Sequence, residues 1–98
     1  MATLVQRVPF GTATFDPIKT VHFLGQEQCF EVEFESGDLH QMVNNELRRA
    51  NGLKAECRDV EAIWLDAETR AGFFVKYADG SEAEASWELV KELPPKKR

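Results

Sequence analysis

Residues 30–37 read Phe-Glu-Val-Glu-Phe-Glu-Ser-Gly, and this stretch decides the fold class. Apolar and acidic side chains alternate as far as Glu35, which is the pattern of a β-strand with one buried face and one exposed face. Ser36 and Gly37 then favour a turn, because glycine adopts positive φ at little steric cost. The stretch therefore predicts an antiparallel strand that ends in a tight turn.

The second half of the chain repeats this pattern. Two motifs share one spacing, Phe30-x-Val32-x-Phe34-x-x-Gly37 and Phe73-x-Val75-x-Tyr77-x-x-Gly80. Leu47 and Val90 follow the two glycines at the same distance. A single hairpin with a short helix cannot bury its apolar face alone, so a true repeat predicts two units packed together. Chance likeness between two hairpins is the alternative.

The predicted elements follow from these patterns. We expect strands at 18–24, 30–35, 39–43, 60–65, 72–78 and 81–85, and helices at 46–50 and 87–93. Asn44 or Asn45 is the expected cap of the first helix and Gly52 its stop, while Ser86 caps the second. The predicted fold class is α+β: two antiparallel β-meanders related by a pseudo-repeat, each followed by a short helix.

A length of 98 residues predicts one domain. We expect an N-terminal arm at 1–17, a single domain at 18–93 with half-units 18–52 and 60–93, and a solvated basic tail at 94–98. In the first strand, Ile18 is expected on the side of Thr20 and His22. Arg48 is interpreted as a partner of the helix dipole.

The second meander is predicted to be apolar on both faces. Phe74 points away from Phe73, and Trp64 opposes its neighbours in the same way, although Trp64 and Trp87 are expected to stack in the core at equivalent places. The terminal helix, the N-terminal arm or a second subunit would cover the extra face. A homodimer is therefore one predicted arrangement.

Composition excludes several classes of protein. The formal net charge is −5, so a nucleic-acid partner is not expected. No apolar run approaches the roughly 18 residues of a membrane helix, and the N-terminus lacks a signal peptide, so we expect a cytoplasmic protein without a membrane partner. Cys29 and Cys57 are then expected to be reduced, with a bridge between them as the alternative.

No pattern predicts catalysis or a cofactor. The ligand types His22, Cys29, His40 and Cys57 lack the close pairs of a structural zinc site. Cys57 has a neighbouring arginine but no organised base, and no nucleophile elbow or phosphate-binding glycine loop occurs. We therefore predict no catalytic residue, no metal ligand, no cofactor and no enzyme.

The predicted binding surface is acidic and aromatic. Glu31, Glu33 and Glu35 lie on one strand face about 7 Å apart. They could dock a basic protein partner or a divalent cation; the alternative is a solvated face with Lys19 or Lys76 opposite. Phe74 and Trp64 complete the set of predicted binding residues.

Five short motifs resemble one family. They are Phe-Glu-Val-Glu-Phe-Glu-Ser-Gly at 30–37, Glu-Leu-Arg at 46–48, Ala-Glu-Cys-Arg-Asp-Val at 55–60, Tyr-Ala-Asp-Gly at 77–80 and Ser-Trp-Glu-Leu at 86–89. Together they are similar to DUF971, the gamma-butyrobetaine hydroxylase-like N-terminal domain. DUF2442 is the runner-up, with a similar Asp-Gly pattern but without the Ser-Trp-Glu-Leu ending.

The DUF971 resemblance implies a small β-rich domain without catalysis of its own. Members occur alone in bacteria, fused to iron–sulfur carrier ATPases, or ahead of 2-oxoglutarate oxygenase domains. Some hold zinc, but Asn51, Leu53 and Ser81 stand here where ligands would be expected. The resemblance thus implies a protein-interaction module of unknown partner; the alternatives are an adaptor in iron–sulfur or metal handling, and a small enzyme.

Overall fold

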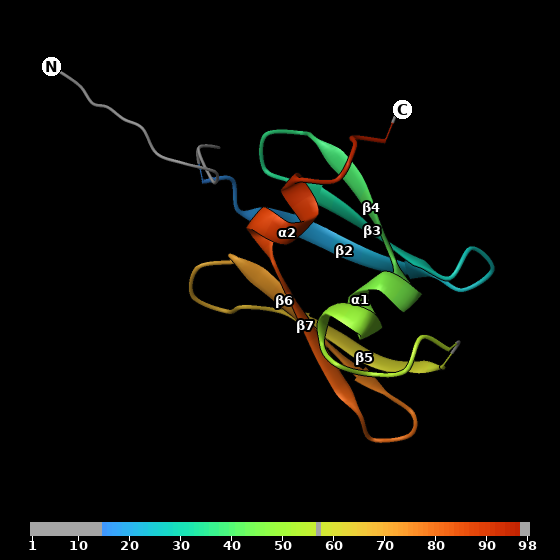
Figure 1. Cartoon of the computed structure of the whole chain (residues 1–98). Helices are drawn as coiled ribbons and strands as arrows, with labels where there is room; N and C mark the ends of the chain where they lie inside the picture. The colour runs from blue at the N-terminus through green and yellow to red at the C-terminus, as the bar shows by residue number, and fades with distance from the viewer. Residues whose placement is uncertain (1–14, 57, 97–98) are drawn as a thin grey trace, which may run out of the picture.

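The computed structural model describes residues 15–56 and 58–96 and confirms the predicted fold class. Within these ranges the elements are β2 (Ile18–Leu24), β3 (Cys29–Phe34), β4 (Leu39–Val43), α1 (Asn44–Ala50), β5 (Val60–Leu65), β6 (Gly72–Tyr77), β7 (Glu82–Ser86) and α2 (Trp87–Lys91). They form two three-stranded antiparallel sheets, β2-β3-β4 and β5-β6-β7, each followed by a short helix (Figure 1). Most of the predicted N-terminal arm, Cys57 and the last two residues lie outside the described ranges.

The predicted repeat extends to the strand register. Val21 pairs with Val32 in the first sheet, and Ile63 pairs with Val75 in the second. Each sheet has a register shift at the same place, between Ile18 and Thr20 in β2 and between Val60 and Ala62 in β5. Gly37 and Gly80 close the equivalent hairpins with φ of 98° and 90°. The two halves are therefore the same structural unit used twice.

The register shift in β2 corrects one prediction. Simple alternation placed Ile18 on the side of Thr20 and His22, and this was wrong. The extra residue of a bulge reverses the alternation, so Ile18 is fully buried on the side where Val21 and Phe23 pack against the core.

The core lies between the inner faces of the two sheets. Phe30 of β3 and Phe73 of β6 meet there with ring centroids 5.6 Å apart. β2 lies beside β5, and both helices contact β4 and β7 on the other side (Figure 1). The buried apolar set is Ile18, Phe30, Val32, Phe34, Met42, Leu47, Phe73, Val75, Tyr77, Ala83, Ala85 and Val90. Burial of each larger side chain stabilises the fold by about 1.5–3 kcal/mol. Because both halves supply these side chains, the core needs both halves.

Each helix places a cation on an aromatic ring of the other half. The Cζ atom of Arg48 in α1 lies 4.5 Å from the centre of the Tyr77 ring in β6. The Nζ atom of Lys91 in α2 lies 4.4 Å from the centre of the Phe34 ring in β3. A desolvated contact of this kind contributes about 2 kcal/mol. Arg48 lies in the last turn of α1, as its interpretation as a dipole partner requires, but it is only 3% exposed, which that interpretation did not predict.

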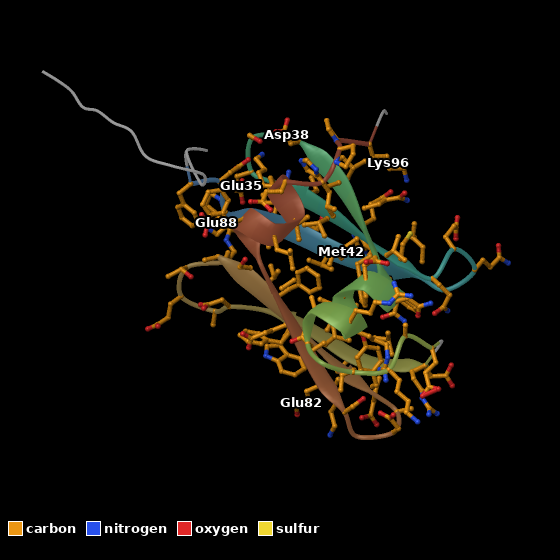
Figure 2. All side chains as sticks on the ribbon, in the orientation of Figure 1. Glu35, Asp38, Met42, Glu82, Glu88 and Lys96 are labelled. Carbon is orange, nitrogen blue, oxygen red and sulfur yellow. The ribbon has the colours of Figure 1, made fainter. Side chains whose placement is uncertain are left out.

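The chain after each helix covers an edge strand of the other half. The Asn51 side chain donates to the Glu84 carbonyl (3.0 Å) and accepts from the Glu84 N–H (3.1 Å), as a neighbouring strand would. Near the C-terminus, the Lys96 N–H donates to the Leu39 carbonyl (2.6 Å). Both contacts protect strand edges that would otherwise template pairing with another chain. Lys96 therefore belongs to the fold and not to a solvated tail, and Figure 2 shows it beside β4.

The helix ends match the predictions in part. Ser86 Oγ accepts from the Leu89 N–H (3.2 Å), which confirms the predicted cap of α2. Gly52, with φ of 75°, ends α1 as expected. The predicted cap at Asn44 or Asn45 was wrong, because α1 begins at Asn44, its N-cap is Val43 and no side chain caps it. The Asn44 Oδ1 atom instead accepts from the Tyr77 hydroxyl (2.7 Å), which joins the two halves.

The last residues of the predicted N-terminal arm pack on the domain. Asp16 is 8% exposed and accepts from Ser36 Oγ (2.5 Å) and from Lys91 Nζ (2.7 Å). Phe15 packs edge-on against Trp87 with ring centroids 5.2 Å apart. The segment before β2 therefore holds α2 against the first sheet.

Replacing Tyr77 with phenylalanine tests the hydrogen bond between the halves. Tyr77→Phe keeps the ring under Arg48 but leaves the buried Asn44 Oδ1 atom without this donor. We expect the free energy of unfolding to fall by about 1–3 kcal/mol, measured by urea denaturation. Trp64→Phe on the exposed face is the control and should change stability by under about 0.5 kcal/mol. An equal effect of both variants would contradict this role.

The Asp16–Lys91 pair predicts a loss of stability in acid. Burial alone would raise the pKa of Asp16, but the hydrogen bonds from Lys91 and Ser36 outweigh it and hold the pKa below its ordinary value of 3.8. The stabilising contribution is therefore complete above the unfolded-state pKa and is lost as the pH falls through the lower folded-state value. Asp16→Asn should lower the free energy of unfolding at pH 7 by about 1–3 kcal/mol. It should also flatten the acid limb, which is the fall of this free energy as the pH is lowered.

Denaturation series from pH 7 to pH 2 measure this effect. Asp59→Asn, at an exposed position, is the matched control and should leave the acid limb unchanged. An acid limb in Asp16→Asn as steep as that of the wild type would contradict the assignment.

Candidate functional site

The candidate site is the outer face of the sheet β5-β6-β7. Trp64, Phe74 and Glu84 are direct cross-strand partners and form one row across the three strands. The Trp64 and Phe74 rings stack with centroids 5.7 Å apart and planes 22° from parallel. Trp64 is 45% exposed, so the row presents aromatic surface to solvent beside a carboxylate.

Strand alternation places these side chains outward. Phe73 and Val75 are fully buried, so Phe74 between them projects from the opposite face of β6. Trp64 lies between the half-buried Ile63 and Leu65, which pack against the core. The prediction that Trp64 lies in the core was therefore wrong, as was its equivalence with Trp87, which begins α2 and contacts Phe15.

A first hollow lies beside this row. Its volume is about 220 Å³, and it is lined by Asn51, Trp64, Phe74, Val75, Glu82, Ala83 and Glu84. Glu82 and Glu84 are both exposed and about 7 Å apart on one face of β7. Neither carboxylate forms an ion pair with any residue in 15–56 or 58–96. Figure 2 shows Glu82 at the rim of the lower sheet.

A second hollow lies on the other side of the row. Its volume is about 170 Å³, and it is lined by Asp66, Ala71, Gly72, Phe73, Phe74, Glu84, Ala85 and Ser86. Gly72 borders this hollow where β6 and β7 approach closely, since a Cβ atom there would lie 2.7 Å from the Ala85 carbonyl oxygen. Asp66 accepts from the backbone N–H groups of Thr69 (3.1 Å) and Glu68 (2.9 Å), and these bonds hold its pKa below the ordinary value. Asp66 is therefore ionised at neutral pH.

The predicted acidic stripe lies on the other sheet. Glu31 pairs with Lys96 (2.6 Å), and Glu35 pairs with Arg70 (2.7 Å). Glu33 is half-buried and also interacts within the protein. Of the predicted binding residues, the structure therefore brings Trp64 and Phe74 together and places the three glutamates on a separate face. The cations that pair with Glu31 and Glu35 are not the expected Lys19 and Lys76. Figure 2 shows Glu35 beside the upper sheet and Glu82 beside the lower one.

Sequence reasoning missed Glu82, Glu84, Asp66 and Gly72. A usable signal was present for Glu84. The Asp-Gly turn at 79–80 fixes the register of the hairpin, and that register places Glu84 opposite Phe74.

The residues weighed as metal ligands do not converge. His40 is buried with its Nδ1 atom 3.0 Å from the Leu93 carbonyl oxygen, and His22 is exposed on β2. Cys29 is a buried free thiol whose pKa is raised by burial and then by Glu27, and Cys57 lies outside the described residues. Across 15–56 and 58–96, no group of three or more His, Cys, Asp or Glu side chains is placed to hold a metal ion. No described helix combines the length and apolar character needed to cross a membrane.

A third hollow, larger than the two on the face of β5-β6-β7, lies between the helices. Its volume is about 420 Å³, and it is lined by Gln41, Met42, Val43, Glu46, Arg49, Ala50, Leu89 and Leu93. Glu46 and Arg49 pair with each other, so this groove offers no unpaired charge from these two residues. The face of β5-β6-β7 combines aromatic surface with unpaired carboxylates and is the better candidate.

Comparisons of this chain with protein-family models, with curated proteins and with solved structures found no match. The resemblance to DUF971 thus stays a prediction, and function is argued from the site.

Two glycine variants test the geometry of the second hollow. Gly72→Ala drives a Cβ atom against backbone, so we expect the free energy of unfolding to fall by about 1–3 kcal/mol. Gly25→Ala is the matched control, because a Cβ atom there meets nothing within 4 Å. Urea denaturation of both variants measures the difference. Equal stability of the two variants would show that Gly72 is not required by close packing.

Proposed function

We propose that this chain is a non-catalytic protein-interaction module that binds a basic segment of a partner protein. The outer face of β5-β6-β7 is the binding surface. The row of Trp64, Phe74 and Glu84 is the single observation that carries the proposal. A cytoplasmic location is part of it, supported by the free thiol of Cys29.

The chemistry of the row matches a cation. The face of an indole ring attracts a lysine or arginine side chain through its quadrupole, with about 0.5–2 kcal/mol per contact. Glu82 and Glu84 supply full negative charges beside that ring. A formal net charge of −5 adds long-range attraction for a basic partner.

The arrangement of the edges favours binding through the face. Asn51 occupies backbone groups of Glu84 on β7, and Lys96 occupies the Leu39 carbonyl on β4. A partner strand would have to displace these contacts to extend either sheet. Among the described residues, no contact of this kind would have to be displaced from the side chains of the exposed row, Trp64, Phe74 and Glu84.

Charge also favours a basic partner over a second copy of this chain. A two-fold dimer whose axis passed through the centre of this face would bring Glu82 and Glu84 of each copy near those of the other. Like charges across an interface are unfavourable. Homodimerisation stays a prediction, and a concentration-dependent increase in mass by light scattering would support it against the present proposal. Neither the metal-handling adaptor nor the small enzyme is favoured by a side-chain cluster in the described ranges.

Charge reversal on the face tests the proposal. The probe is a fluorescein-labelled decapeptide of alternating basic residues and glycine, with three lysines and two arginines, titrated with the full chain. Trp64→Ala should weaken binding about three- to tenfold, and Glu84→Lys should weaken it further because it adds repulsion. Circular dichroism checks that each variant is folded.

Glu27→Lys in the β2–β3 turn is the control, because it makes the same change of net charge away from the face. It should weaken binding much less than Glu84→Lys. Equal loss in both variants would mean that net charge alone drives binding, and absence of binding by the wild type would contradict the proposal.

A further inference from the structure

Two hollows on the face are spaced like alternate side chains of an extended peptide. The first opens on the Glu82 side of the Phe74–Glu84 row, and the second opens on the Gly72 side. Along β6 and β7 they are offset by about two residues, which is about 7 Å. Side chains at positions i and i+2 of an extended segment have the same separation.

Both hollows offer negative charge beside an aromatic wall. Glu82, Glu84 and Trp64 line the first, while Asp66 and Glu84 line the second. Phe74 forms a wall of both. Each hollow can therefore take one cationic side chain, and Glu84 between them can contact both.

The shape of the site favours a planar cation. The Trp64 and Phe74 rings stack on each other with planes 22° from parallel, so each ring turns one face to its neighbour and keeps one flat face away from it. A guanidinium group stacks on such a surface and still donates two parallel hydrogen bonds to a carboxylate. A lysine ammonium group is more strongly hydrated and lacks this planar fork.

We infer that the segment bound by this face is extended and carries two arginines two residues apart. One guanidinium group stacks on Trp64 and pairs with Glu82 or Glu84, and the other enters the hollow beside Gly72 and pairs with Asp66. This inference rests on the proposed function and adds the identity and spacing of the recognised residues.

Four capped peptides of equal length test this inference. They contain Arg-Gly-Arg, Arg-Arg, Arg-Gly-Gly-Arg or Lys-Gly-Lys in a glycine–serine background. The full chain carrying Trp87→Phe is the receptor, because Trp64 is then its only tryptophan and reports binding by fluorescence. We expect Arg-Gly-Arg to bind about fivefold more tightly than each of the others.

Each result has a separate meaning. Equal affinity for Lys-Gly-Lys would overturn the choice of arginine, and equal affinity for the other two arginine peptides would overturn the spacing; both leave the proposed function intact. Failure of all four peptides to bind, together with failure of the basic decapeptide, would contradict the proposed function itself.

Asp66→Asn assigns the second subsite independently. Asparagine can still accept the turn hydrogen bonds from Glu68 and Thr69 but has no charge. We expect about threefold weaker binding of Arg-Gly-Arg and no change for a peptide with a single arginine. Unchanged binding of Arg-Gly-Arg by the folded variant would overturn the second subsite.

Discussion

The reciprocal contact between helix cations and aromatic rings is the interaction on which the rest of the structure depends. Arg48 covers Tyr77, and Lys91 covers Phe34, so each half of the chain supplies the cover for the other. A hydrogen bond also joins the two halves: the Asn44 side chain of the first half accepts from the Tyr77 hydroxyl of the second. Neither half can bury its own aromatic residues without its partner, and the chain therefore forms one domain.

This exchange determines which surfaces are free for function. The inner faces form the core, and the segments after the helices occupy the edges of β4 and β7. The outer faces remain, and they differ at equivalent register positions. Glu31, between His22 and Gln41, corresponds to Phe74, between Trp64 and Glu84. The candidate site thus lies at positions where the two units have the same strand register but different side chains.

Local patterns in the sequence were sufficient to predict the elements. Alternation around Phe30 and Phe73, with glycine turns after each, located both central strands and indicated the repeat. Ser86 and Gly52 marked helix ends correctly because capping depends on neighbouring backbone groups. The exposed pair of Trp64 and Phe74 was predicted in part: alternation set both side chains apart from the inner face, while the expected equivalence with Trp87 wrongly placed Trp64 in the core.

The missed features depend on contacts between distant residues. The helix-dipole rule explains a solvated Arg48 equally well, and only the position of Tyr77 in space shows that it is buried. The partners of Glu31 and Glu35 come from Lys96 and Arg70, far along the chain, so no pattern within the strand could identify them.

Native-state hydrogen exchange tests the mutual dependence of the halves most directly. In the wild-type chain, the slowest amides of β3 and β6 should open with the same free energy, because each sheet unfolds only with the other. Val90→Ala in α2 should lower the protection of both strands by the same amount. Loss of protection in β6 while β3 keeps its wild-type value would show that the halves fold independently and would contradict this account.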